Sequence, residues 1–157
     1  MALLNIEKGT DNEILRTKST PVGKPNKKLV KLLDNMRETM IAVNGVGLAA
    51  PQVGKNIRAC VCFFNQGMNN ELIVDMIDPE IVNFSEETRI EEEGCLSLPG
   101  KFGNVERHNG VSVKYSNRKG EEQVLKLEGL NAAIVQHEVD HLDGKLFVDR
   151  MRPPGLG

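Results

Sequence analysis

Two histidines and a glutamate in the last quarter of the sequence form the pattern His-Glu-Val-Asp-His at residues 137–141. On an α-helix, His137 and His141 lie on one face about one turn apart, so both imidazoles can bind a single metal ion. Glu138 lies roughly 100° around the helix from His137. From there its carboxylate can reach a water molecule activated by the ion without binding the ion itself. The pattern therefore predicts a metal site with a general base beside it.

A surface helix can carry this pattern by chance, but the neighbouring residues favour the metal site. The chain has three histidines, and two of them are in this motif. Leu130, Ala133 and Ile134 fall on the same helical stripe as His137 and His141, by i, i+3 and i+4 spacing. Core packing explains the aliphatic side chains, but it does not explain paired histidines at the end of their stripe. We therefore expect an apolar wall that leads to the metal.

A catalytic site of this kind usually has three protein ligands and one open position. Downstream of the motif, Asp143 is too close to fold back easily, and Asp149 has little chain after it in this sequence. Upstream, Cys95 in the segment 93–97 (Glu-Gly-Cys-Leu-Ser) is the best candidate for the third ligand. A thiolate is a strong ligand, and the preceding glycine lets the backbone approach a bound group. One cysteine and two histidines suit zinc or ferrous iron.

The remaining cysteines and histidine are weaker ligand candidates. Cys60 and Cys62 lie two residues apart in an apolar stretch, so they share one side of a strand, where buried packing is the expected role. A Cys-x-Cys metal site is the alternative for this pair. His108 is expected to be a turn residue, and it is the next ligand candidate if Cys95 is not one. The odd cysteine count without framework spacing predicts free thiols.

Hydrophobic periodicity predicts the elements that position these residues. Helices are expected over 24–42 and 130–142, the second ending near Gly144. The strands expected between them group together, which predicts an α+β fold. In this fold, antiparallel β-sheets pack around the C-terminal helix that carries the motif, with one further helix near the N-terminus. The predicted strands are 57–64, 71–77, 80–84, 111–115 and 123–127.

Length and composition set the broad class. The 157 residues fit one domain, 1–157, with 39% apolar and 27% charged residues, as in ordinary globular proteins. The net charge of −2 gives no electrostatic reason to expect nucleic-acid or membrane binding. The N-terminal residues lack the pattern of a secretory signal, and no apolar run approaches the ~18 residues of a membrane span. We therefore expect a cytoplasmic protein, and a monomer.

Three segments together resemble the peptide deformylase family. They are 45–54 (Gly-Val-Gly-Leu-Ala-Ala-Pro-Gln-Val-Gly), 93–97, and 136–142 (Gln-His-Glu-Val-Asp-His-Leu). Each segment alone is a weak pointer, but all three occur in the family's order with similar separations, over roughly residues 1–150. The resemblance implies an enzyme that removes the N-formyl group from N-formylmethionyl peptides, the nascent polypeptides, and releases formate. The nascent peptides place the reaction at the ribosome, whereas a ribosome contact made through a C-terminal helix is not expected for this sequence.

The resemblance also implies roles for individual residues. Cys95, His137 and His141 would bind one divalent metal ion, which would be Fe²⁺ in cells, with Zn²⁺, Ni²⁺ or Co²⁺ able to substitute. Glu138 would be the general base and later the proton donor to the departing amine.

The side-chain amide of Gln52 and the backbone N–H of Leu96 would form the oxyanion hole by resemblance to the family. Outside such a motif, Gln52 would be interpreted as a turn residue after Pro51. In similar enzymes the substrate binds as an added strand, for which the bare backbones at Gly47 and Gly94 leave room. The pocket for the first side chain, normally methionine, would be lined by Val46, Leu130, Ala133 and Ile134.

The sequence departs from the family at two places. Many bacterial members continue into a C-terminal helix, whereas residues 151–157 here contain two prolines and two glycines, as in shortened, phage-encoded forms. The three glutamates at 91–93 put acidic side chains where some relatives have an apolar residue near the substrate pocket, so substrate preference is expected to shift. Glu93, Arg107 and Asp140 are candidates either for charge pairing that steadies the ligand helix or for surface salt bridges.

Two other functions fit the motif. A different metallohydrolase, such as a peptidase or amidase, would share the His-Glu-x-x-His pattern, but it would normally find its third ligand downstream. A non-enzymatic binding module with a structural ion would need four protein ligands and would leave Glu138 and Gln52 without a role.

Overall fold

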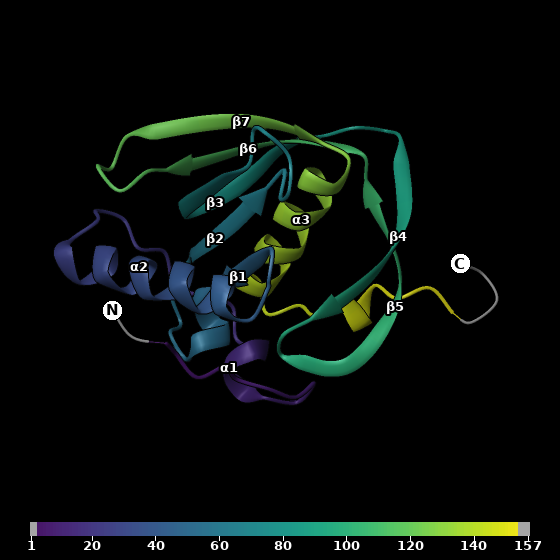
Figure 1. The fold of residues 1–157 in the computed structure, drawn as a ribbon, viewed down its shortest axis with the longest axis horizontal. Coiled ribbons are helices and arrows are strands. Elements are labelled where there is room, and N and C mark those ends of the chain that lie inside the picture. Colours follow the sequence, from purple (N-terminus) through teal and green to yellow (C-terminus); the bar gives the residue numbers. More distant parts are fainter. Residues whose placement is uncertain (1–2, 154–157) are drawn as a thin grey trace.

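The computed structural model describes residues 3–153 and shows an α+β fold, as the sequence predicts (Figure 1). Its helices are α1 (Glu13–Arg16), α2 (Lys27–Ala42) and α3 (Leu130–Leu142), with short 3₁₀ turns η1 (Ala50–Val53) and η2 (Phe147–Asp149). Its strands are β1 (Gly47–Ala49), β2 (Ala59–Phe64), β3 (Leu72–Phe84), β4 (Thr88–Cys95), β5 (Leu98–His108), β6 (Gly110–Ser116) and β7 (Glu122–Glu128). No helix within residues 3–153 is long and apolar enough to cross a membrane.

Five strands form one antiparallel sheet in the order β1-β2-β3-β6-β7, and β4 and β5 form a separate antiparallel hairpin. Strand β2 is apolar throughout because both of its faces are covered. Ala59 and Val61 pack in a cluster with α2, whereas Cys60, Cys62 and Phe64 pack in a cluster with α3. Alternation along β2 therefore buries both faces of this strand, one against each long helix.

Helix α3 lies between the five-stranded sheet and the β4–β5 hairpin, at the centre of the fold (Figure 1). It begins after Gly129, whose φ of 63° is a conformation that glycine adopts without strain. It ends at Leu142, which confirms the predicted range of 130–142. Ten of its thirteen residues are buried. A polar motif on such a helix must find its partners inside the protein.

Helix α2 begins three residues later than predicted. The side chain of Asn26 accepts a hydrogen bond from Leu29 N at 2.9 Å and caps the helix, so Lys24 lies outside it. This cap satisfies one of the free N–H groups of the first turn.

The prediction of two strands over 71–84 was wrong in one respect, because β3 is continuous through Asp78 and Pro79. The pairing with β6 shifts register between Ile77 and Glu80, which is a β-bulge. Asp78 has a φ of 51°, and its carboxylate accepts hydrogen bonds from Val22 N at 2.7 Å and Gly23 N at 2.8 Å. The turn residues therefore bend a strand and do not end it.

The β4–β5 hairpin, α1 and β1 were not predicted from the sequence. In the hairpin, most side chains are exposed or half-buried, so the apolar alternation that marks a strand is missing. Cross-strand polar pairs hold it together, including Thr88 with Glu106 and Arg107 with Glu93. Elements α1 and β1 span four and three residues, too few to show any periodicity.

After η2 the chain returns along β5. Met151 bridges Val105, and Arg152 N donates to Asn104 O at 2.8 Å. Residues 151–153 are not helical, whereas residues 154–157 of the predicted helix-free tail lie outside the described part of the chain.

Candidate metal centre

The fold brings three potential ligands to one point. Cys95 is the last residue of β4, and His137 and His141 lie one turn apart on α3. Cys95 Sγ is 3.3 Å from His141 Nε2, which is 3.2 Å from His137 Nε2. All three ligand atoms lie within 4.8 Å of one another, although Cys95 is more than 40 residues from either histidine in sequence.

These distances fit one metal ion. Metal–ligand bonds of about 2.0–2.1 Å to nitrogen and about 2.3 Å to sulfur place the ligands of a tetrahedral ion roughly 3.3–3.6 Å apart. Burial holds the pKa of His141 well below its usual value, so this ring is neutral, as a ligand must be. A thiol and two imidazoles are also a donor set suited to Zn²⁺ or Fe²⁺. The residues present can therefore hold one divalent ion and leave a fourth position open.

The His137 ring is held from two sides. Its Nδ1 lies 2.9 Å from Glu93 Oε1, so Nε2 faces His141 and Cys95. On another side the ring of Phe147 is stacked on it, with centroids 6.3 Å apart and planes at 20°. Burial lowers the pKa of His137, but hydrogen bonds with Cys95 and Glu93 outweigh this effect and raise it to about 10. A metal ion can bind His137 only after the ring loses its second proton, so metal binding is expected to release a proton.

Glu93 is itself fixed by Arg107, whose Nε and Nη2 donate to its two oxygens at 2.8 and 2.9 Å. Burial raises the pKa of Glu93, but the hydrogen bonds from Arg107 and His137 outweigh it and lower the pKa to about 2. The carboxylate is thus charged, which favours the Nδ1–H tautomer of His137. The expected charge pairing of Glu93, Arg107 and Asp140 is confirmed, and it acts on a candidate ligand.

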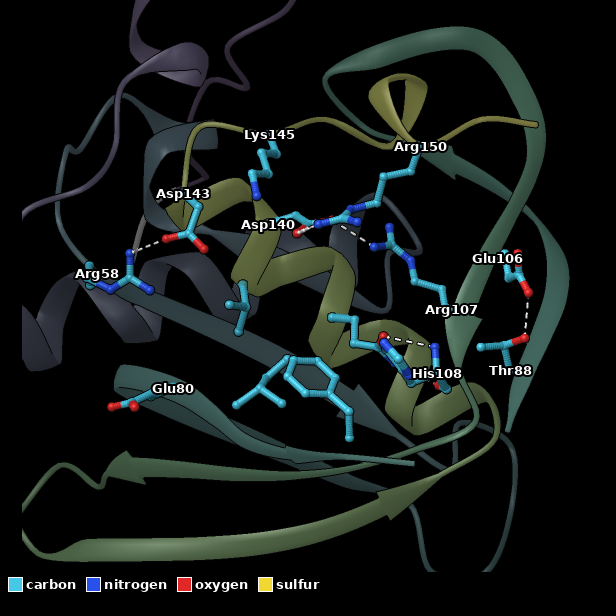
Figure 2. A pocket seen from close by; sticks show the side chains of 14 residues that line it. Arg58, Glu80, Thr88, Glu106, Arg107, His108, Asp140, Asp143, Lys145 and Arg150 are labelled. Atoms are coloured by element: carbon cyan, nitrogen blue, oxygen red, sulfur yellow. Dashed lines mark hydrogen bonds and ion pairs between the residues drawn. The ribbon is translucent and has the colours of Figure 1, made fainter. Parts of the chain in front are cut away.

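Arg107 also lines a cavity of about 640 Å³, here called the second cavity, which is separate from the cleft beside the candidate ligands described below (Figure 2). There Arg107 Nη1 donates to Asp140 Oδ2 at 2.7 Å. Arg150, which follows η2, also binds Asp140, with Nε 2.6 Å from Oδ2 and Nη2 3.0 Å from Oδ1. Arg107 therefore connects the carboxylate next to His137 with the Asp140 carboxylate, which projects from the ligand helix into the second cavity.

Glu138 lies beside the three ligand candidates and is 4% exposed. Its Oε1 is buried without a hydrogen-bond partner, and burial raises its pKa to about 7. Gly47 of β1 makes this position possible, because a Cβ atom on Gly47 would lie 2.7 Å from Cδ of Glu138. A carboxyl group with this pKa can take up and release protons near neutral pH.

Gln52 in η1 presents its amide nitrogen to the site. Its Oε1 accepts from Ala49 N at 2.9 Å, which fixes the amide so that Nε2 points toward Ser97 and Cys95. Nε2 lies 3.1 Å from Ser97 Oγ and 3.5 Å from Cys95 Sγ. Ser97 is fully buried, and it is a contact of Gln52 that the sequence did not reveal. The amide donor is therefore oriented by the backbone of β1 and lies next to the thiol.

A cleft of about 480 Å³ opens beside these residues. Gln52, Cys95, His137 and Glu138 lie in its wall. Every residue expected to contact substrate also lines it: Val46, Gly47, Gly94, Leu96, Leu130, Ala133 and Ile134. Side chains that the sequence did not point to complete the wall: Asn44, Leu98, Pro99 and Phe102.

Phe102 and two acids shape the outer part of this cleft. Gly94 pairs with Phe102 across the hairpin, and a Cβ atom on Gly94 would lie 2.7 Å from Cε1 of the ring. No signal in the sequence places this ring, because the contact depends on the pairing of the two hairpin strands. Glu91 and Glu92 also line the cleft, as expected from the acidic run.

The alternative ligand candidates lie elsewhere. Cys60 and Cys62 are fully buried in the cluster between the sheet and α3, as predicted for packing residues. His108 was predicted to be a turn residue, which was wrong, because it ends β5. Its Nδ1 lies 2.7 Å from Ser85 O, and its ring packs on Phe84 with centroids 4.7 Å apart.

Comparison with known proteins gives a consistent result. A family model described as polypeptide deformylase matches residues 4–156. A peptide deformylase of Halothermothrix orenii is 46% identical over 151 residues, which cover 96% of this chain and 95% of the relative. A class I type b peptide deformylase from Acinetobacter baumannii, whose crystal structure has Met-Ala-Ser bound, gives a TM-score of 0.87 at 40% identity, covering 96% of this chain and 99% of that one.

A probable peptide deformylase from Synechococcus phage S-SSM7 gives a TM-score of 0.87 at 41% identity, covering 94% of this chain and 99% of the phage chain. The resemblance to the family thus extends to a phage member, as the sequence indicated. The similarity spans both the β4–β5 hairpin and α3, the elements that carry the candidate ligands. This chain belongs to the peptide deformylase family.

Proposed function

We propose that this protein removes the N-formyl group from N-formylmethionyl peptides, with Glu138 moving the protons of the reaction. One observation carries the proposal: Cys95, His137 and His141 converge next to a buried carboxyl group at the wall of a cleft. The donors suit a single divalent ion with one open position, which is the arrangement of a hydrolytic site rather than a closed structural one.

Cys95 Sγ and the Nε2 atoms of His137 and His141 would hold the ion. A divalent ion supplies Lewis-acid chemistry there, since it lowers the pKa of water to about 7 and polarises a carbonyl oxygen. We take Fe²⁺ as the ion used in cells, with Zn²⁺, Ni²⁺ or Co²⁺ able to substitute, because the thiolate–imidazole donor set accepts each of them.

Glu138 is the proton carrier in this proposal. Its free Oε1 takes a proton from the water that attacks the formyl carbon. The same carboxyl group then gives the proton to the amide nitrogen as the C–N bond breaks, which releases formate and a free amino terminus. The pKa of about 7 suits both steps, because a group near the working pH accepts and donates with equal ease.

The Gln52 amide and the Leu96 backbone N–H stabilise the negative charge that develops on the formyl oxygen. Gln52 is suited to this role because Ala49 N fixes its Oε1 and leaves Nε2 facing the cleft. One preset donor of this kind contributes about 3 kcal/mol to the transition state.

The substrate lies in the cleft between β1 and the end of β4. The backbones at Gly47 and Gly94 pair with the extended peptide, since neither carries a side chain that would hold it away. The methionine side chain enters the apolar part of the cleft. Met-Ala-Ser, which is bound in the Acinetobacter baumannii relative, is a peptide of the kind that deformylation yields. The methionine pocket is lined by Val46, Leu130, Ala133 and Ile134.

The setting of this reaction follows from the substrate. We place the protein in the cytoplasm, as a monomer with one catalytic domain over residues 1–157. It acts there on nascent peptides at the ribosome, without contact with nucleic acid or membrane. The domain assignment is supported by the central position of α3, whose residues contact the five-stranded sheet and β5 alike.

The test is formate release from formyl-Met-Ala-Ser by enzyme loaded with one divalent ion, measured beside the Glu138→Ala variant. The wild-type protein is expected to release formate, and the variant to retain the ion but lose turnover. Cleavage of internal peptide bonds without formate release would instead point to a metallopeptidase. Full activity of Glu138→Ala would rule out the role of Glu138 as the proton carrier.

A further inference from the structure

We propose that Arg150 is a positioning residue for His137, although it lies outside the cleft. The inference rests on the proposed function in one respect, namely that His137 is a metal ligand. Three ion pairs in series, Arg150–Asp140, Asp140–Arg107 and Arg107–Glu93, lead from Arg150 to the contact of Glu93 with His137.

The connection consists of short contacts between charged groups. Arg150 binds both oxygens of Asp140, at 2.6 and 3.0 Å (Figure 2). Asp140 Oδ2 also accepts from Arg107, whose two other nitrogens hold both oxygens of Glu93. Glu93 Oε1 then accepts from His137 Nδ1 at 2.9 Å.

Arg150 matters because Arg107 serves two buried carboxylates. Asp140 is 8% exposed, so little water can replace a lost donor. With Arg150 in place, two arginines face two acids, and Arg107 can keep two of its nitrogens on Glu93. Without Arg150, one guanidinium must neutralise both carboxylates, and Asp140 has no other side-chain donor within hydrogen-bond distance among the described residues. Arg107 is then drawn toward Asp140, which loosens its hold on Glu93.

The segment that carries Arg150 is anchored independently of Asp140. Asp149 binds both terminal nitrogens of Arg16, at 2.6 and 3.1 Å. Met151 bridges Val105 on β5, and Phe147 stacks on His137 itself. The segment that places Arg150 against α3 is therefore held by contacts on both sides of this residue. Removing the Arg150 side chain leaves those contacts in place.

The expected effect is on metal retention. Removing a direct hydrogen-bond partner of a metal ligand typically costs 10–100-fold in affinity, and Arg150 is three ion pairs away from that partner, Glu93. We therefore expect the release of Co²⁺ or Zn²⁺ to become about three- to tenfold faster in Arg150→Ala. The absorption spectrum of the Co²⁺ form should shift as well, because the His137 ring is less firmly oriented.

The experiment compares Arg150→Ala with Arg152→Ala. Arg152 lies in the same segment and carries the same charge, but among the described residues its ion pair is with Glu106, at 3.0 Å. Each purified protein is loaded with Co²⁺, the spectrum is recorded, and release to an excess of chelator is timed. Thermal unfolding of each variant separates a change at the metal from a general loss of stability. Arg150→Lys, which keeps the charge but not the two-point contact, should fall between wild type and Arg150→Ala.

Faster release and an altered spectrum in Arg150→Ala, with Arg152→Ala like wild type, would support the proposal. Equal release from both variants, or an Arg150→Ala protein that matches wild type, would overturn it. If Arg150→Ala does not fold, Arg150→Lys and Arg150→Gln take its place and must show the same order. A wild-type protein that binds no Co²⁺ or Zn²⁺ would overturn the metal site as well, which distinguishes the two failures.

Discussion

Gly47 of β1 lies so close to the carboxyl group of Glu138 that no side chain fits between them. A Cβ atom at residue 47 would lie 2.7 Å from Cδ and 3.0 Å from Cγ of Glu138, below ordinary van der Waals contact. The glycine therefore fixes where the proposed proton carrier can sit. Because β1 also forms a wall of the cleft, the same backbone that faces the substrate sets the position of the carboxyl group.

Gly47→Ala is expected to displace Glu138 while leaving the metal ligands in place. General acid–base catalysis typically contributes 10²–10⁴-fold, so we expect kcat to fall by about two orders of magnitude or more. Metal content should remain near one ion per chain. Gly110→Ala is a suitable control, because its Cβ atom would meet no atom closer than 3.6 Å. Normal turnover in Gly47→Ala would show that the carboxyl group can work from another position.

Glu93→Ala is expected to weaken metal binding. It removes the acceptor for His137 Nδ1–H and leaves Arg107, which is 4% exposed, with Asp140 as its remaining partner. We expect the dissociation constant for Zn²⁺ to rise about 10–100-fold, measured by competition with a chromophoric chelator. Glu93→Gln keeps an acceptor oxygen and should have a smaller effect. Wild-type affinity in Glu93→Ala would mean that Phe147 stacking alone orients the ring.

Gln52→Leu tests the donor to the formyl oxygen. The change removes the donor Nε2 and fills the same buried position with an apolar side chain of similar size. Loss of one oxyanion donor typically lowers kcat by about 10²–10³-fold, whereas KM should change little. Since Gln52 also accepts from Ala49 N, thermal unfolding must be measured beside the kinetics. A fall in stability without a fall in kcat would assign Gln52 a structural role only.

The outer cleft is expected to disfavour acidic substrates. Glu91 and Glu92 line it, and no lysine or arginine lies in its described wall, although Arg89 forms an ion pair with Glu91 from outside that wall. Comparing kcat/KM for formyl-Met-Lys and formyl-Met-Glu peptides should show a preference for lysine. Replacing both acids by glutamine should reduce the ratio by about two- to fivefold, the range for exposed charges. Added salt should reduce it too.

The control for this selectivity is the pair Glu86→Gln and Glu122→Gln. Both carboxylates are exposed and lie outside the cleft wall. Replacing them changes the net charge by the same amount as replacing Glu91 and Glu92, without changing the cleft. An equal loss of preference in the control pair would attribute the effect to net charge and not to the cleft.

Much of the fold was predictable where a single periodicity dominates. The 130–142 helix has an apolar stripe and a glycine at each end, and its predicted bounds are those observed. Strand β2 was recognisable as a short apolar run. The β4–β5 hairpin was not, because ion pairs and cross-strand hydrogen bonds hold it, and these leave no periodic signature.

The same distinction applies to the site. The His-Glu-x-x-His spacing and the Glu-Gly-Cys segment point to chemistry through residue type, so the ligand candidates could be named in advance. The contacts of Arg150 with Asp140, of Phe147 with His137 and of Phe102 with Gly94 depend on how the chain folds back on itself. A local pattern cannot contain such contacts.

The most direct test of the metal centre is X-ray absorption on the protein loaded with one equivalent of Zn²⁺. We predict one sulfur ligand at about 2.3 Å and two imidazole nitrogens at about 2.0–2.1 Å, with the sulfur contribution absent in Cys95→Ser. A Zn²⁺ ion without sulfur in its coordination shell, or with the same sulfur signal in wild type and Cys95→Ser, would contradict the assignment.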